Sequence, residues 1–350
     1  MIKVIVVDDS PVVRSLLEEI LSSDADIDVV ATASDPYEAR EKIKLYNPDV
    51  ITLDIEMPKM DGVTFLKNLM RLRPMPVIMI SSLTERGADV TLDCLELGAV
   101  DYIEKPKVNL NDTLLSYKTL IIEKIKTAAQ VNSNALDINN NKVTKPENLR
   151  SKSSLDRVDV IAVGASTGGT EAIKNFLQSL AYPAPPIVIV QHIPPNFSAS
   201  FANRLDKLLQ FTVKEVQSDN IKLVPGHIYI APGDRHLAIQ KVQSGYLTKL
   251  IDGDPVNRHK PSVDVLFDSV SKYAGNSAVG IILTGMGDDG AKGLLRMKES
   301  GALTIAQDKA SSVVWGMPGS AVALNAAVKV LPLMKISDQL RRYLEGEKVT

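Results

Sequence analysis

Short apolar runs alternate with amphipathic stretches along the first third of the chain. The apolar runs are rich in β-branched residues and lie at 2–7, 27–33, 49–53, 76–80 and 100–104. The stretches after Ser10 (PVVRSLLEEILSS) and from Asp35 (DPYEAREKIKLY) have apolar residues at helical spacing. Ser10 as a capping residue and Pro11 at the first helical position indicate a helix start. Strands that alternate with helices predict a parallel, doubly wound α/β sheet.

The same alternation returns in the second half of the chain. Apolar runs that predict buried strands lie at 158–165, 185–191 and 277–285. Between the halves, residues 126–157 contain no aromatic residue, six asparagines and four serines, a composition that cannot bury a core. The pattern predicts two doubly wound parallel-sheet domains, 1–125 and 158–346, joined by a flexible linker at 126–157.

Composition and charge narrow the class of protein. Hydrophobic residues make up 45% and charged residues 23% of the chain, as in ordinary globular proteins. The net charge of −2 argues against nucleic acid as a partner, and no apolar run reaches the length of a membrane span. The start, MIKVIVVDDS, does not resemble a targeting peptide. A single cysteine, Cys94, fits a reducing cytoplasm, and its helical context predicts a buried structural role.

In the first half, charged and hydroxyl side chains stand where the predicted strands end. Asp8 and Asp9 follow the first strand, Asp54 the third, Ser81 the fourth and Lys105 the fifth. Carboxyl ends of parallel strands share one edge, where ligands bind. Three crowded carboxylates repel one another unless a cation such as Mg²⁺ lies among them. Each residue could instead be a polar strand end, but the set together favours a site in which Asp54 accepts a phosphoryl group.

These residues closely resemble the receiver domains of two-component response regulators. The resemblance rests on VVDDS around Asp9, LDIEMPKMDG from Leu53, Ser81 and Lys105-Pro106, and it covers residues 1 to about 122. It implies a flavodoxin-like fold and phosphorylation of Asp54 by a histidine kinase. It also implies Mg²⁺ held by Asp9, Asp54 and the Glu56 backbone carbonyl, with Asp8 in the same acidic group. Tyr102 is implied as the aromatic switch that responds to Ser81.

The second half is organised around a strand, a glycine turn and a helix at 160–170, VIAVGASTGGT. This geometry suits either a dinucleotide cradle or an exposed nucleophile, here Ser166. The next predicted strand leads to His192, and the third leads to Asp288 and Asp289. Serine, imidazole and carboxylate at one sheet edge are the groups required for nucleophilic acyl transfer.

Two other readings of the glycine turn fit less well. A dinucleotide fold needs a central glycine where Ser166 stands, and an acidic residue near the end of the second strand, where Gln191 and His192 stand. An α/β-hydrolase has the order serine, acid, histidine, which this chain could satisfy only with an earlier acid and His259. The remaining histidines, His227 and His236, lie at predicted strand starts, where a structural or solvated role is the default.

The order Ser166, His192, Asp289 and the segments GASTGG, QHIPP and LTGMGDDG resemble the protein-glutamate methylesterase/glutaminase family of bacterial chemotaxis. The resemblance implies a Rossmann-like catalytic domain with Ser166 as nucleophile, His192 as base and Asp289 as orienting acid. The Met286 backbone N–H is implied as an oxyanion donor, Thr167 as a site neighbour, and the loop 314–319 as a nearby segment. Asp288 departs from the asparagine common in the family, so the choice of Asp289 over Asp288 stays open.

The family resemblance implies a cytoplasmic enzyme of chemotaxis. Its substrates are glutamyl methyl esters, and specific glutamines, on the cytoplasmic region of chemoreceptors. Its phosphodonor is a chemotaxis histidine kinase, and Mg²⁺ serves phosphorylation whereas the esterase chemistry needs no cofactor. No membrane insertion is expected. Phosphorylation of Asp54 is expected to free a catalytic crevice covered by the receiver. A receiver whose output half binds a partner or DNA, and a catalytically degenerate scaffold, are the alternatives.

Overall fold

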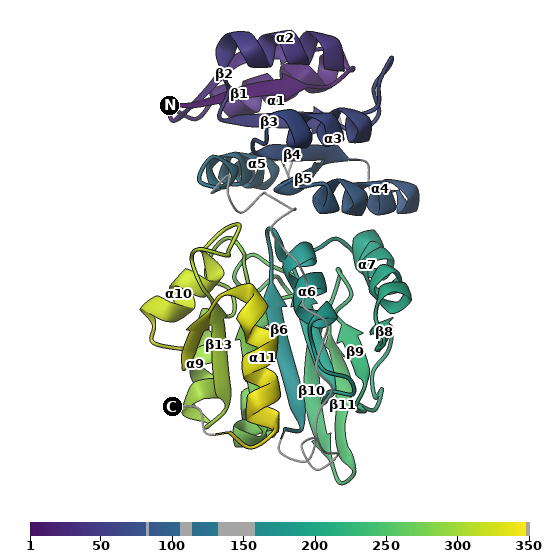
Figure 1. Ribbon diagram of the computed structural model, residues 1–350, viewed down its shortest axis with the longest axis vertical. Helices are drawn as coiled ribbons and strands as arrows, with labels where there is room; N and C mark the ends of the chain where they lie inside the picture. Colours follow the sequence, from purple (N-terminus) through teal and green to yellow (C-terminus); the bar gives the residue numbers. More distant parts are fainter. Residues whose placement is uncertain (82–83, 106–113, 132–157, 348–350) are drawn as a thin grey trace. The chain divides into compact units, whose positions relative to one another are not determined.

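The computed structural model describes residues 1–81, 84–105, 114–131 and 158–347. The chain divides into two compact units, Met1–Asn141 and Lys142–Thr350 (Figure 1). Residues 132–157, most of the predicted linker, lie outside the described residues. The first residues of that predicted linker, Lys126–Ala128, extend the last helix of the first unit instead.

The first unit alternates strands and helices as predicted. Its elements are β1 (Ile2–Val7), α1 (Pro11–Ser22), β2 (Ile27–Ala33), α2 (Pro36–Tyr46), β3 (Val50–Asp54), α3 (Gly62–Leu72), β4 (Val77–Ser81), α4 (Glu85–Glu96), β5 (Asp101–Glu104) and α5 (Leu114–Ala128). The strands form one parallel sheet in the order β2-β1-β3-β4-β5. The predicted doubly wound sheet is therefore confirmed for this unit.

Local sequence sets the helix starts of the first unit. Ser10 precedes α1 in extended backbone and its hydroxyl accepts a hydrogen bond from the Val13 N–H, while Pro11 begins the helix. Asp35 caps α2 in the same way, through the N–H groups of Tyr37 and Glu38. These caps satisfy backbone donors that would otherwise lack a partner.

The second unit also has a parallel sheet, with a hairpin added. Its elements are β6 (Val160–Ala165), α6 (Gly169–Gln178), β7 (Ile187–Gln191), α7 (Pro195–Leu208), β8 (Thr212–Glu215), β9 (His227–Ile230), β10 (His236–Val242), β11 (Gly245–Ile251), α8 (Val263–Tyr273), η4 (Gly275–Ser277), β12 (Ala278–Ile282), α9 (Ala291–Glu299), β13 (Leu303–Gln307), α10 (Met317–Ala323), β14 (Lys329–Leu331) and α11 (Leu333–Leu344). The sheet order is β14-β13-β12-β6-β7-β9-β8, and β10 and β11 form a separate antiparallel pair.

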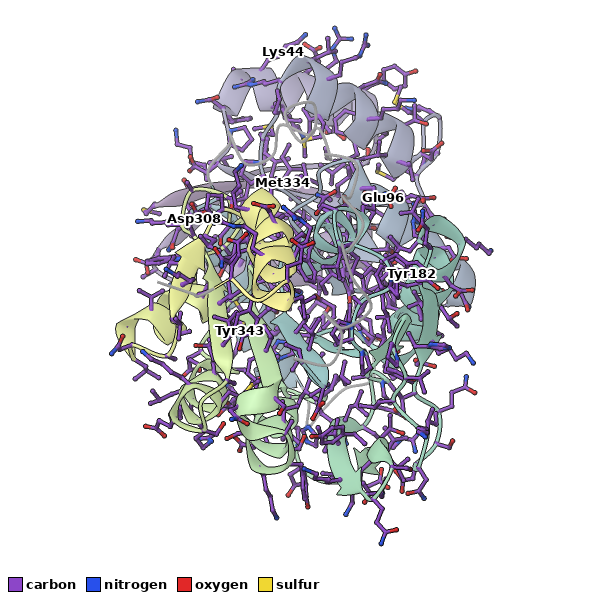
Figure 2. All side chains as sticks on the ribbon, turned by 60° about the horizontal axis from the view of Figure 1, so that its bottom comes forward. Lys44, Glu96, Tyr182, Asp308, Met334 and Tyr343 are labelled. Atoms are coloured by element: carbon purple, nitrogen blue, oxygen red, sulfur yellow. The ribbon has the colours of Figure 1, made fainter. Side chains whose placement is uncertain are left out.

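Helices cover this second sheet on both faces. Helices α6 and α11 pack against each other in front of the strands in Figure 1, and Met334 and Tyr343, labelled in Figure 2, mark the first and last turns of α11. Helices α8 and α9 pack together, and α8 also contacts the β10–β11 hairpin. Val160 and Ala162 of β6 and Phe267 of α8 belong to one buried apolar cluster. The continuous apolar strands of the sequence are thus explained by burial on both faces.

The strand orders fix where each crevice lies. In the first sheet the connection after β1 leads to β2 on one side, whereas the connection after β3 leads to β4 on the other side. The sheet therefore reverses direction between β1 and β3. The second sheet reverses between β6 and β12, because β7 lies on one side of β6 and β12 on the other. Ligands of open α/β sheets bind beyond the carboxyl ends of the strands at such a reversal. Asp54 ends β3, and Ser166 follows β6.

Several smaller expectations have their outcomes here. His227 and His236 begin β9 and β10, as expected, and Cys94 is fully buried. The predicted loop at 314–319 is wrong at its end, because Met317 starts α10, with Pro318 in its first turn. The β10–β11 hairpin was not predicted. No helix among the described residues is long and apolar enough to cross a membrane.

Candidate functional site

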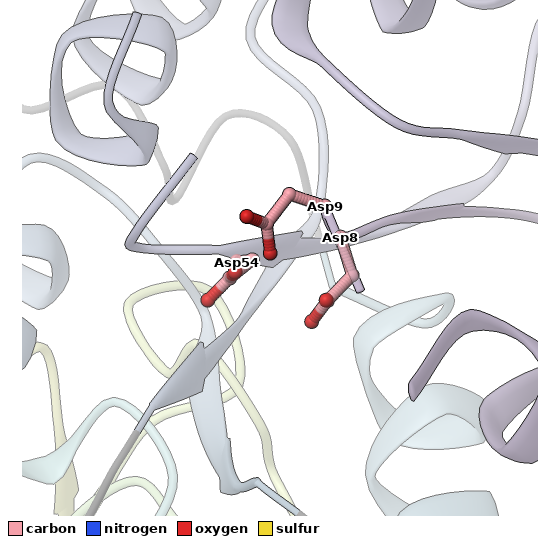
Figure 3. A group of neighbouring side chains, drawn as sticks. All are labelled: Asp8, Asp9 and Asp54. Atoms are coloured by element: carbon pink, nitrogen blue, oxygen red, sulfur yellow. The ribbon is translucent and has the colours of Figure 1, made fainter. Parts of the chain in front are cut away.

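Three carboxylates gather at the carboxyl edge of the first sheet. Figure 3 shows Asp8, Asp9 and Asp54, and one oxygen from each lies within 4.8 Å of the others. Asp8 and Asp54 are fully buried, whereas Asp9 is exposed. The Oδ2 atom of Asp8 is buried and has no hydrogen-bond partner among the described residues. A buried carboxylate oxygen without a partner is costly, and a hard cation bound here would satisfy it.

Lys105 contacts this acidic group from the neighbouring strand end. Its Nζ lies 2.8 Å from Asp54 Oδ2 and 3.8 Å from Asp8 Oδ2. Burial raises the pKa of Asp54 to about 6, as does the charge of Asp8, while the hydrogen bond from Lys105 opposes the shift. Burial also raises the pKa of Asp8. A second positive charge beside Asp54, in addition to that of Lys105, would therefore stabilise the ionised carboxylate.

Of the other residues expected at this edge, Ser81 and Glu56 contact Lys105 and Asp54. Ser81 ends β4 fully buried, its Oγ lies 2.6 Å from Thr91 Oγ1 of α4, and its carbonyl accepts a hydrogen bond from the Lys105 N–H. The Glu56 N–H donates to Asp54 Oδ1 at 3.4 Å. Tyr102 lies on β5 with its ring buried. The sequence did not predict the contact of Thr91 with Ser81, because helical periodicity does not show which strand residue a helix side chain contacts.

The buried Asp54 carboxylate predicts a pH-dependent gain in stability for Asp54→Asn. Because the pKa of Asp54 is raised to about 6 in the fold, from about 3.9 unfolded, its ionisation destabilises the unit above pH 6 and costs nothing below pH 4. Without metal ions, the Asp54→Asn substitution should stabilise the first unit at pH 7.5 by on the order of 2 kcal/mol. Calorimetry of the full chain in chelator at pH 7.5 and pH 4.5 measures this. A lower melting temperature for the variant at pH 7.5 would contradict it.

In the second unit, strand register brings Ser166 and His192 together. Ala165 of β6 pairs with Gln191 of β7, and Ser166 and His192 are the residues that follow. The His192 N–H donates to the Ala165 carbonyl at 3.1 Å. The Gln191 side-chain Nε2 donates to the backbone carbonyls of Ser166 and His192, at 2.9 and 3.3 Å. The two residues are therefore fixed to one another through the sheet and through one buried amide.

Glycines allow the backbone to approach Ser166 closely. A Cβ on Gly285 would lie 2.8 Å from Ser166 Cβ and 2.3 Å from Met317 Sδ, so only glycine fits there. The Ser166 N–H donates to the Thr284 carbonyl at 3.0 Å. Gly168 has φ +72°, which turns the chain into α6 directly after Ser166. The site sequence GASTGG thus forms the strand-turn-helix arrangement that the pattern predicts.

Asp289, not Asp288, contacts the histidine. His192 Nε2 lies 2.8 Å from Asp289 Oδ2, and Asp289 is 1% exposed whereas Asp288 is exposed. Burial raises the pKa of Asp289, but hydrogen bonds from His192, Asn257 and Ser262 outweigh it and hold the pKa well below its usual range. Asp289 is therefore ionised, and of the two neighbouring aspartates it is the one that contacts His192.

The histidine presents its other nitrogen without a partner. His192 Nδ1 is buried and makes no hydrogen bond within the described part of the chain, so it is not bonded to Ser166 Oγ in this structure. In serine proteases the acid pairs with Nδ1 of the histidine, whereas here Asp289 pairs with Nε2. Catalytic hydrogen bonds are often absent without substrate and form in the complex. The ring of His259 stacks on His192, with centroids 3.7 Å apart and planes 9° apart.

The remaining expected neighbours surround the same turn. Thr167 is buried and its carbonyl accepts a hydrogen bond from Thr284 Oγ1, and Met286 follows Gly285 directly. The segment 314–319 reaches the site, because the Gly285 N–H donates to the Val314 carbonyl and the Gly285 carbonyl accepts from the N–H groups of Gly316 and Met317. This segment therefore lies beside Ser166, although part of it is helical.

Comparison with known proteins covers both units. Residues 161–340 match the family described as CheB methylesterase, and residues 4–114 match the response regulator receiver domain. The protein-glutamate methylesterase/protein-glutamine glutaminase of Hydrogenovibrio crunogenus is 51% identical over 97% of this chain and 98% of its own length. The protein of the same name from Salmonella typhimurium is 51% identical over 97% of this chain and 96% of its own.

A solved structure matches the second unit. The Thermotoga maritima CheB methylesterase catalytic domain is 39% identical, with a TM-score of 0.51. The match covers 53% of this chain and 98% of that domain. Both the sequence and the fold of this unit therefore have relatives that are named as methylesterases.

Proposed function

Because the chain belongs to the CheB methylesterase family of enzymes, with a response regulator receiver domain at its N-terminus, we propose that it hydrolyses glutamyl methyl esters of chemoreceptors at Ser166. The observation that supports this most directly is the His192–Asp289 pair placed one strand from Ser166. Release of methanol from a methylated receptor fragment by the full chain tests the activity. Absence of release, with or without a phosphodonor, would reject it.

The reaction follows from the roles of three side chains. Ser166 Oγ attacks the γ-carbonyl carbon of the ester while its proton passes to His192 Nδ1. Asp289 stabilises the resulting imidazolium through Nε2. The proton then moves to the departing methoxide, which leaves as methanol, and an acyl-enzyme remains. Water, deprotonated by His192, releases glutamate and restores Ser166. The same route on a glutamine side chain releases ammonia.

The negative charge that develops on the carbonyl oxygen of the ester during the reaction needs hydrogen-bond donors that stabilise it. Helix α6 begins at Gly169, three residues after Ser166, and its N-terminus carries a partial positive charge. We assign the Met286 N–H as a further donor, supported by its position after Gly285, and Thr167 as a neighbour of the same turn. Preorganised donors of this kind usually contribute about 10²–10³ in rate each.

The receiver edge fits a magnesium ion. Asp9 and Asp54, with the Glu56 backbone carbonyl and Asp8 nearby, would hold it, and the buried Asp8 oxygen that lacks a hydrogen bond among the described residues supports this assignment. When bound, Mg²⁺ neutralises the phosphoryl oxygens that approach Asp54. Lys105 is placed to pair with the phosphoryl group, and Ser81 and Tyr102 are the proposed switch residues. The phosphodonor in the cell is a chemotaxis histidine kinase, and the proposed location is the cytoplasm.

Phosphorylation of Asp54 is expected to raise esterase activity. A small phosphodonor with Mg²⁺ should increase methanol release by the full chain roughly 5- to 150-fold, the usual range of coupling between two sites. Asp54→Asn should keep basal activity and lose the response, because the phosphoacceptor carboxylate is gone. Asp49→Asn, which changes an exposed carboxylate before the other end of β3, is the matched control and should respond normally. A response in Asp54→Asn would place the phosphoacceptor elsewhere.

A truncated chain that begins near Leu155 tests how the receiver acts. If the receiver restrains the catalytic unit, the truncated chain should hydrolyse ester faster than the unphosphorylated full chain. A truncated chain that is no faster would argue against occlusion while leaving the esterase assignment intact.

A further inference from the structure

One segment supplies nearly all the donors that hold the Asp289 carboxylate. Among the described residues, every donor apart from His192 comes from residues 257–264, which form the end of the loop before α8 and the first turn of that helix. The Oδ1 atom accepts hydrogen bonds from Asn257 Nδ2, Ser262 Oγ and the Asp264 N–H. The Oδ2 atom accepts one from the Val263 N–H. The direction in which Oδ2 faces His192 is therefore set by this segment.

The Asn257 side chain has a second carboxylate partner. Its Nδ2 donates to Asp289 Oδ1 at 2.8 Å and to Asp264 Oδ2 at 2.7 Å, one N–H for each. Asp264 is buried and its Oδ1 accepts the Gly293 N–H of α9 at 2.5 Å. Burial raises the pKa of Asp264, and the charge of Asp289 adds to that shift. Asn257 thus lies between two buried acidic groups and donates to both.

The loop that carries Asn257 is itself held in a defined shape. His236, which is 2% exposed, accepts the Ser262 N–H at Nδ1, and its Nε2 pairs with the Asp254 carbonyl at 3.0 Å. Asn257 has φ +51°, a left-handed conformation that asparagine tolerates well. The same loop presents the His259 ring that stacks on His192. The position of the Asn257 side chain beside Asp289 is therefore set by the fixed backbone of this loop.

We propose that Asn257 is a positioning residue of the ester hydrolysis. Its amide separates the Asp264 and Asp289 carboxylates and orients Asp289 toward His192 Nε2. Without the amide the two carboxylates lose the hydrogen-bond donor that they share, so Asp289 rotates or takes up a proton and holds the imidazole less well. Asn257 acts through Asp289 and contacts neither the substrate nor Ser166. The proposal rests on the esterase function proposed above.

The test compares Asn257→Gly with Asn220→Gly in the full chain. Both residues are asparagines with positive φ, and Asn220 uses its amide oxygen for a hydrogen bond from Gln240 away from the site. Glycine keeps the backbone conformation, so both variants should fold. Asn257→Gly should lower kcat for methanol release roughly 10- to 100-fold, as expected for a lost hydrogen bond to a charged group, with KM unchanged within about twofold. Asn220→Gly should match the unsubstituted protein.

Two further measurements separate positioning from general loss of structure. The Nε2–H proton of His192, followed by NMR with ¹⁵N-labelled histidine and assigned with His192→Gln, should shift or broaden in Asn257→Gly alone. The double variant Asn257→Gly/Asp264→Asn should recover part of the lost kcat, since a neutral amide no longer repels Asp289.

Three results would overturn the proposal: unchanged kcat in Asn257→Gly, an unchanged His192 signal, or no recovery in the double variant. The NMR measurement needs no substrate. Failure of the esterase function would instead appear as an inactive unsubstituted protein, whatever the His192 signal does.

Discussion

Ser166→Ala should reduce methanol release from a methylated receptor fragment by about 10⁴-fold or more, with substrate binding retained. Removing the hydroxyl removes the only group proposed to form the acyl-enzyme, while the donors around the carbonyl oxygen stay in place. The substitution is small, and Ser166 Oγ does not bond to His192 Nδ1 in this structure, so stability should change little. Initial rates of methanol release and binding of the fragment measure the two effects separately.

Ser218→Ala is the matched control, because Ser218 is exposed and lies outside the site. It should hydrolyse ester at the normal rate. If Ser166→Ala kept full activity, Ser166 would not be the nucleophile and the proposed mechanism would be rejected.

Asp289→Asn should lower kcat about 10³- to 10⁴-fold, because an amide can hold the imidazole in the wrong tautomer and cannot stabilise its cation. Asp288→Asn, one residue away and exposed, should change kcat less than about threefold, as surface positions usually do. Measuring kcat and KM for both variants, with melting temperatures as a check on folding, decides the assignment. A larger loss in Asp288→Asn would show that the exposed aspartate carries the role.

Much of the architecture could be predicted because strands buried on both faces leave a strong signal. The runs ending at Asp54, Ser81, Gln191 and the turn after β12 were found as strands, and the parallel-sheet rule placed their polar ends at one edge. The same rule led to Ser166, His192 and Asp289 as the proposed catalytic residues. Local periodicity and a general rule of topology were sufficient for these elements.

Contacts between distant segments could not be predicted in this way. Asn257 and His259 belong to a polar loop whose path depends on His236, Asp254 and Ser262, and none of those interactions leaves a periodic signal. The preference for Asp289 over Asp288 as the proposed orienting acid rests on burial and on the contact with His192, which two adjacent aspartates in a sequence do not reveal. The start of α10 at Met317 was missed because its glycines and proline are typical of turns.

The pairing of Ala165 with Gln191 has a consequence for how such chains can change in length over evolution. Because Ser166 and His192 each follow a paired residue, a deletion inside β6 or β7 would shift the register and turn buried side chains to the other face. Tyr182 and Pro183, in the turn between α6 and β7, carry no such restriction, since they are exposed and lie outside the paired residues. Among functional homologues, insertions and deletions should therefore be found in this turn and be absent from β6 and β7.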